Sequence, residues 1–202
     1  MQPTIMALDL EGVLIPEIWI AFSKKTGIEK LKLTTRDISN YDELMQMRLG
    51  ILQEHDLKLA DIQEVIGTLD PMPGAKEFLD WLRTQVQVVI LSDTFYEFAK
   101  PLMAKLGFPT LFCHSLEADA EGYISSYNIR IPDPKKKAVE SFKALNFRVY
   151  AAGDSYNDTT MLGAAHQGIL FKAPAKVAEE FPHFPLFHEY HDLKEYLIKE
   201  WD

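Results

Sequence analysis

Short apolar runs that stop abruptly at polar residues recur along the chain and restrict its fold more than any other feature. These runs are residues 4–8, 86–91, 149–152 and 168–171. Helical patterns lie between or after them, at 73–83, 96–106 and 134–145, each with Pro or Gly at one end. Strands that alternate with helices predict an α/β fold. In such a fold an open parallel sheet is flanked by helices, and ligands bind beyond the carboxyl ends of the strands.

One long segment, Glu17 to Leu69, interrupts this alternation directly after the first strand and its turn. Its helical pieces are 16–26, 41–55 and 59–69, and no convincing strand pattern lies among them. We therefore expect a small helical cap over residues 15–70, inserted into an α/β core made of residues 1–14 and 71–202.

Two further segments have recognisable patterns. The stretch 111–131 contains a Glu-Gly turn between extended runs and predicts a hairpin, and 191–201 predicts a closing helix. With 202 residues, 47% of them hydrophobic, the chain can bury one substantial core and a small subdomain.

Charge and cysteine content exclude several classes of partner. The formal net charge of -9 argues against broad contact with nucleic acid or an anionic membrane. Cys113 is the only cysteine, so no intrachain disulfide can form; it is expected to be a packed side chain. The apolar runs are far shorter than the roughly 20 residues that span a bilayer, and no leader pattern precedes Asp9. We expect a cytoplasmic protein; its oligomeric state stays open.

Acidic residues follow three of the predicted strands: Asp9 with Glu11, Asp93, and Asp154 with Asp158. Any one of them reads as an ordinary turn or helix-capping residue. In a parallel sheet, however, all three strand ends meet at one edge, where clustered carboxylates repel one another unless a cation offsets them. Oxygen ligands without a His or Cys cluster favour magnesium.

A hydroxyl and a cation complement these carboxylates. Ser92 ends the second apolar run and Lys135 begins a helical pattern, so both could hold the oxygens of a phosphoryl group. Alone, Ser92 reads as a cap and Lys135 as a solvated surface charge.

Taken together, these residues resemble the four motifs of the haloacid dehalogenase superfamily of phosphohydrolases, over nearly the whole chain. The motif residues are Asp9-Leu10-Glu11-Gly12-Val13, Leu91-Ser92-Asp93-Thr94, Lys135 and Gly153-Asp154-Ser155-Tyr156-Asn157-Asp158. The last motif and the helical insertion look most like the phosphoserine phosphatase branch. The start of the chain looks like its bacterial members that also transfer a phosphoryl group to homoserine.

The resemblance implies a role for each motif. Asp9 would attack phosphorus and become an aspartyl phosphate. Asp9, the backbone carbonyl of Glu11 and Asp154 would hold Mg²⁺. Glu11 would protonate the leaving alkoxide and later deprotonate the attacking water.

Five further residues would support the phosphoryl group or the substrate. Ser92 and Lys135 would bind phosphoryl oxygens, with Asp93 in the same phosphate- and substrate-binding set, and Asp158 would orient Lys135 or a water on the metal. Asn157 would touch the substrate or only fix the fourth motif's loop.

The first motif departs from the superfamily's usual pattern, because its second acidic residue is ordinarily Asp and is Glu11 here. The extra methylene displaces the carboxylate. We hypothesise that this slows attack by water and gives homoserine time to accept the phosphoryl group.

Substrate choice is expected to lie in the cap. Arg48 falls where the helical period of 41–55 expects an apolar residue, so it either extends to solvent along its stem or grips a substrate carboxylate. Glu17 would pair with the substrate ammonium, or it is an ordinary acidic residue in a helix's first turn. His188 and His191 lack a third ligand and do not predict a metal site.

The leading hypothesis is thus a magnesium-dependent phosphatase for L-phosphoserine, with homoserine as a further acceptor. A phosphatase for another small metabolite would share the core and would not need Arg48 and Glu17. A phosphoacceptor switch in the manner of receiver domains would also use clustered carboxylates. The helical insertion and Glu11 speak against the switch.

Overall fold

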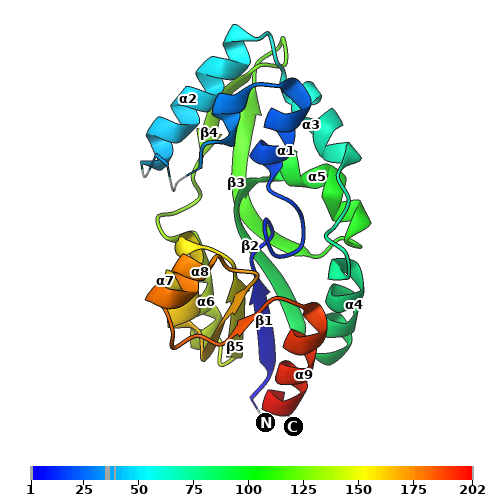
Figure 1. Cartoon of the computed structure of the whole chain (residues 1–202), viewed down its shortest axis with the longest axis vertical. Helices are drawn as coiled ribbons and strands as arrows, with labels where there is room; N and C mark the ends of the chain where they lie inside the picture. The colour runs from blue at the N-terminus through cyan, green and yellow to red at the C-terminus, as the bar shows by residue number, and fades with distance from the viewer. Residues whose placement is uncertain (1, 35–36, 39, 202) are drawn as a thin grey trace.

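The computed structural model describes residues 2–34, 37–38 and 40–201, and a seven-stranded sheet forms its centre (Figure 1). The sheet order is β4-β3-β2-β1-β5-β6-β7. The strands are β1 (Thr4–Leu8), β2 (Gln87–Phe95), β3 (Thr110–Ala118), β4 (Ile124–Asn128), β5 (Arg148–Gly153), β6 (Gln167–Phe171) and β7 (Leu186–Phe187). Neighbouring strands are parallel except β3 and β4, which form an antiparallel hairpin. The predicted open parallel α/β sheet is confirmed, with one antiparallel strand at its edge.

Helices flank the sheet, and further helices lie at one end of the molecule (Figure 1). They are α1 (Ile18–Thr26), α2 (Tyr41–Glu54), α3 (Leu59–Thr68), α4 (Ala75–Gln85), α5 (Tyr96–Lys105), α6 (Pro134–Ala144), α7 (Thr159–Ala164), α8 (Ala175–Glu180) and α9 (Tyr190–Trp201), with 3₁₀ turns at Glu29–Lys32 and Tyr156–Asp158. Within the described residues, no helix is long and apolar enough to cross a membrane.

Alternation along β1 divides the core into two layers. Met6 and Leu8 pack in one buried cluster with side chains of α4, α5 and α9, whereas Ile5 and Ala7 pack in the other with side chains of α6 and α7. This is the two-residue period of a strand buried on both faces. Each fully buried Leu or Ile contributes about 1.5–3 kcal/mol, so the two apolar layers stabilise the sheet that carries the acidic strand ends.

The three helices between β1 and α4 lie at the end of the molecule that β3 and β4 also reach (Figure 1). Hydrogen bonds join them to their neighbours: the Tyr127 hydroxyl donates to Asp42 at 2.7 Å, and the Gln63 side chain donates to the Glu97 carbonyl at 2.8 Å. The backbone N–H of Leu59 also donates to the Gly122 carbonyl at 3.0 Å. Helices α2 and α3 are therefore held against the β3–β4 hairpin and α5 at this end of the molecule.

The predicted end of the second strand is wrong. The apolar run was expected to stop at Leu91, but β2 continues to Phe95, which pairs with His114. The register shifts between Leu91 and Phe95, so an irregularity of the ladder falls at residues 92–94. Bulges of this kind re-aim side chains, and here the irregular stretch lines the cavity described below. The short elements α7, α8 and β7 were not predicted, because two to six residues carry too little periodicity.

Candidate active site

The first turn after β1 places Asp9 against the fourth motif. The Asp9 N–H donates to the Ala152 carbonyl at 2.9 Å, and its Oδ1 accepts from the Leu10 N–H at 2.7 Å. Gly12 has φ +77°, and a Cβ there would stand 2.6 Å from the Asp154 carboxylate. The turn thus needs a glycine for two reasons, its left-handed backbone and its close approach to Asp154.

Lys135 at the start of α6 is the electrostatic centre of the site. Its Nζ lies 2.8 Å from Asp158 Oδ1, 2.9 Å from Asp9 Oδ1 and 3.2 Å from Asp93 Oδ2, and only 3% of its side chain is exposed. Burial by itself would lower the pKa of Lys135, but these three carboxylates outweigh it and raise the pKa well above its ordinary value. The ammonium is therefore held charged and fixed in position.

Both oxygens of Asp158 are engaged by the protein. Oδ1 contacts Lys135, and Oδ2 accepts from the N–H groups of Asp154 at 3.0 Å and Ser155 at 3.1 Å. A Cβ on Gly153 would stand within 2.5 Å of this carboxylate, so the strand end accepts only glycine here. Asp158 thus supports Lys135 and the fourth motif's loop from inside the protein.

Three buried carboxylates could hold a cation. Asp9, Asp154 and Asp158 each offer an oxygen, and these oxygens lie within 4.8 Å of one another. Burial, and then the charge of Asp158, raises the pKa of Asp9 well above its ordinary value, against the opposing effect of Lys135. A divalent cation would offset this repulsion. An all-oxygen set of this kind fits Mg²⁺.

The irregular end of β2 supplies the next group of side chains. Ser92 is 3% exposed, and its Oγ accepts from the Thr94 N–H at 3.2 Å. Asp93 Oδ2 accepts from Asn157 Nδ2 at 2.7 Å in addition to facing Lys135. Burial would raise the pKa of Asp93, but Lys135 and Asn157 bring it below its ordinary value. Asp93 is thus a carboxylate paired with both Lys135 and Asn157.

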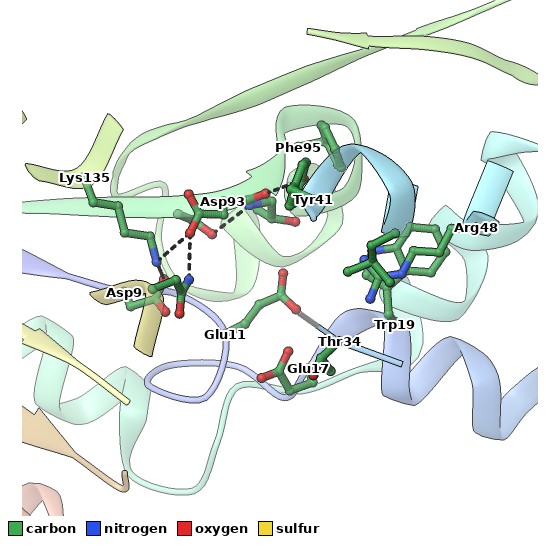
Figure 2. A pocket seen from close by; sticks show the side chains of 14 residues that line it. Asp9, Glu11, Glu17, Trp19, Thr34, Tyr41, Arg48, Asp93, Phe95 and Lys135 are labelled. Carbon is green, nitrogen blue, oxygen red and sulfur yellow. Dashed lines mark hydrogen bonds and ion pairs between the residues drawn. The ribbon is translucent and has the colours of Figure 1, made fainter. Parts of the chain in front are cut away.

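One small cavity connects these groups to helices α1 and α2. Its volume is about 120 Å³, and it is lined by Asp9, Glu11, Glu17, Trp19, Thr34, Tyr41, Leu44, Arg48, Ser92, Asp93, Thr94, Phe95, Lys135 and Asn157. Figure 2 shows Asp9 and Lys135 on one side, Arg48 and Trp19 on the opposite side, and Glu11 and Glu17 between them. The cavity therefore has a cation near each end and two carboxyl groups in the middle.

Glu11 lines the cavity together with Glu17. Its Oε2 accepts from the Ile18 N–H at 2.9 Å. Burial, followed by the charge of the neighbouring Glu17, raises the pKa of Glu11 to about 8, so its carboxyl group is mostly protonated at neutral pH. Glu17 precedes α1, and its side chain makes no capping hydrogen bond. The two glutamates face the cavity as a pair.

Within the residues that the structure describes, Arg48 is a buried cation without a salt-bridge partner. It is 6% exposed, its Nη2 donates to the Leu33 carbonyl at 2.8 Å, and its guanidinium lies 4.4 Å from the centre of the Trp19 ring. Its buried Nε has no hydrogen-bond partner, and Arg48 forms no salt bridge within the described part of the chain. Burial lowers the pKa of Arg48 to about 10, so it stays charged at neutral pH. Such a group suits an anionic ligand.

The fold gathers the residues that the sequence singled out. Eight of them line this one cavity, and Asp154 and Asp158 lie beside Asp9. Sequence reasoning missed six lining residues: Trp19, Thr34, Tyr41, Leu44, Thr94 and Phe95. Tyr41 and Leu44 belong to the apolar stripe that Arg48 interrupts in the sequence. That stripe was the available signal for these two residues. Cys113 is buried outside the cavity, as expected for a packed side chain, and burial raises the pKa of its thiol to about 12.

The fold and the acidic strand edge define a class of hydrolase, and comparison with known proteins agrees. Residues 4–166 match the haloacid dehalogenase-like hydrolases, and the chain belongs to this family. It is 64% identical to phosphoserine phosphatase ThrH of Pseudomonas aeruginosa over 195 residues, which cover 96% of this chain and 95% of that protein. It is 63% identical to a phosphoserine phosphatase of Pseudomonas syringae pv. tomato, over 96% of this chain and 82% of that protein.

Solved structures share the fold at much lower identity. A phospho-aspartyl intermediate analogue of phosphoserine phosphatase superposes with a TM-score of 0.77 at 19% identity, covering 97% of this chain and 99% of that one. A substrate-bound phosphoserine phosphatase complex gives a TM-score of 0.77 at 20% identity, covering 98% and 99%.

Proposed function

We propose that the protein is a magnesium-dependent phosphatase that hydrolyses L-phosphoserine through an aspartyl phosphate on Asp9. The observation that carries this is the cavity with a cation near each end, Lys135 at one and Arg48 at the other. A small substrate with a phosphate at one end and a carboxylate at the other fits that arrangement. The names of the two close relatives support the same substrate.

The phosphoryl end would perform the covalent chemistry. Asp9 attacks phosphorus, so that an O–P bond to Asp9 forms while the bond to the serine oxygen breaks. Lys135 and the Ser92 hydroxyl stabilise the equatorial oxygens. Asp9 and Asp154, with the Glu11 backbone carbonyl, would hold Mg²⁺, which supplies positive charge against the transferring group.

Glu11 would move the protons. It faces the cavity between the phosphoryl end and Arg48, and it is mostly protonated at neutral pH. It gives its proton to the leaving serine alkoxide. It then takes a proton from the water that attacks the aspartyl phosphate, releasing phosphate and restoring Asp9.

The cap would recognise the amino-acid half of the substrate. The substrate carboxylate would take the place of the anion that Arg48 lacks, in a charge-assisted hydrogen bond to the buried guanidinium. Glu17 would receive the ammonium group, since its side chain faces the cavity and makes no capping hydrogen bond. In this proposal residues 15–70 act as the cap and the remaining residues as the catalytic core.

A second acceptor would compete with water. Because the first motif carries Glu11 where the superfamily ordinarily has Asp, a displaced base would delay hydrolysis and allow homoserine to take the phosphoryl group. Replacing Glu11 by Asp would then lower the ratio of phosphohomoserine to phosphate. An unchanged ratio would refute this explanation.

The deciding experiment measures phosphate release from L-phosphoserine with Mg²⁺, with and without excess homoserine, while phosphohomoserine is followed directly. Phosphoethanolamine, which lacks the carboxylate, and p-nitrophenyl phosphate are the matched controls. We expect phosphoserine to be turned over with a far higher kcat/KM than phosphoethanolamine. Turnover of p-nitrophenyl phosphate alone would keep the catalytic core but assign the cap to a different small phosphorylated metabolite.

A further inference from the structure

His114 on β3 is a buried imidazole next to the phosphoryl end of the cavity. It is 4% exposed, and its ring packs against Phe95 with the centroids 6.2 Å apart. Its Nε2 lies 3.8 Å from Asp93 Oδ1. No motif in the sequence pointed to it, because the irregular end of β2 is what brings Asp93 to this strand.

The ring's hydrogen bond defines its tautomer. His114 Nδ1 accepts from the backbone N–H of Arg130 at 3.2 Å, so in the neutral ring the proton is on Nε2. Burial lowers the pKa of His114, with Asp93 opposing and Arg130 and Lys135 adding to the effect. The neutral imidazole therefore presents an N–H toward Asp93.

Asp93 is a carboxylate that needs to be held in place. Its Oδ2 faces Lys135 at 3.2 Å and accepts from Asn157 at 2.7 Å, which leaves Oδ1 toward His114. Asp93 also lines a second cavity of about 570 Å³, together with His114 and Asn157. A carboxylate that turned away from Lys135 would put uncompensated negative charge beside an incoming phosphate.

We propose that His114 is a positioning residue for phosphoryl transfer. Its Nε2–H holds Asp93 Oδ1, which keeps Oδ2 on Lys135 and Asn157, and Lys135 in turn stays aimed at the phosphoryl group. The 3.8 Å separation shortens to a hydrogen bond when substrate fills the site, as catalytic hydrogen bonds often do. The inference rests on the proposed chemistry at Asp9 but not on the amino-acid half of the substrate.

Two amide substitutions separate this role from simple packing. His114→Asn retains an acceptor for the Arg130 N–H but has no donor at the Nε2 position. His114→Gln reaches the Nε2 position with a donor. His114→Phe fills similar space with neither, and serves as the second loss variant if His114→Asn does not fold.

Each variant would be assayed for kcat and KM with L-phosphoserine and p-nitrophenyl phosphate and for inhibition by inorganic phosphate, with thermal melts as the folding control. We expect His114→Asn to lower kcat/KM about tenfold and weaken phosphate inhibition, and His114→Gln to stay within about twofold of the parent, since a hydrogen bond to a charged group is lost in one and kept in the other. In an Asp93→Asn background, His114→Asn should lower kcat/KM by less than about twofold.

Equal losses of kcat/KM in His114→Asn and His114→Gln would overturn the proposal. So would a loss of kcat/KM from His114→Asn that is as large in the Asp93→Asn background as in the parent protein. If the parent protein hydrolyses p-nitrophenyl phosphate but not phosphoserine, the substrate assignment fails. The comparison among His114 variants is then decided with the aryl phosphate alone.

Discussion

The guanidinium of Arg48 lies 4.4 Å from the centre of the Trp19 ring, inside the protein and without a carboxylate partner in the described chain. The aromatic face and the Leu33 carbonyl stabilise the cation in part. Neither is an anion, so burial of the charge is not fully compensated until a ligand arrives. The electrostatics of this pair therefore favour binding of an anion.

Arg48→Met tests that reading. Met keeps most of the apolar stem and removes the charge, so we expect kcat/KM for phosphoserine to fall about 100-fold, the scale of a lost buried charge pair. The variant's kcat/KM for p-nitrophenyl phosphate should stay within a few-fold of the value for the parent protein. Lys24→Met, which replaces an exposed lysine on helix α1, is the matched control. Equal losses on both substrates would show that Arg48 supports the fold of the cavity rather than the carboxylate.

Glu17→Gln should move the pH profile of the reaction. The charge of Glu17 helps to raise the pKa of Glu11 to about 8, so the parent kcat/KM should fall as the pH rises past that value and the general acid loses its proton. Removing the charge lowers the pKa of Glu11, and the alkaline limb should shift to lower pH. The measurement is the pH at which kcat/KM falls on the alkaline side, irrespective of the maximum value of kcat/KM. An unchanged pH would show that Glu17 does not raise the pKa of Glu11.

Asp9→Asn should abolish turnover and change the response to metal. Because the pKa of Asp9 is raised in the folded state, its ionised form costs stability at neutral pH, and the neutral amide should raise the melting temperature measured in EDTA. Mg²⁺ should stabilise the parent protein by mass action but have little effect on the variant. The test is a pair of melting curves for each protein, with EDTA and with excess Mg²⁺. Equal Mg²⁺ stabilisation of both would remove Asp9 from the proposed ligand set.

Gly12→Ala should strain the backbone of the turn after β1 and crowd Asp154. The residue has φ +77°, and the added Cβ would meet the Asp154 carboxylate at 2.6 Å. We expect a loss of roughly 1–3 kcal/mol in unfolding free energy, the cost of strain at such a position, together with weaker Mg²⁺ dependence of activity. Gly50→Ala is the control, because nothing lies within 4 Å of a Cβ there. The measurement is the unfolding free energy of both variants in denaturant. Equal unfolding free energies for Gly12→Ala and Gly50→Ala would contradict the proposed crowding.

The order of strands and helices determined most of the fold and the location of the site. Asp9 and Asp154 each follow an apolar run, and parallel strands bring such ends to one edge whatever the details of packing. Arg48 stood out because it broke an apolar stripe. These are local patterns, so they can be read from neighbours in the chain.

Only the tertiary structure decided which side chains pair across the site. The three carboxylates around Lys135 come from three different strand ends, and the contact between His114 and Asp93 depends on an irregular ladder that no local pattern announces. The raised pKa of Glu11 likewise needs Glu17 beside it in a buried cavity. Electrostatic coupling depends on distance and burial rather than on sequence separation, and only the folded chain sets those two quantities.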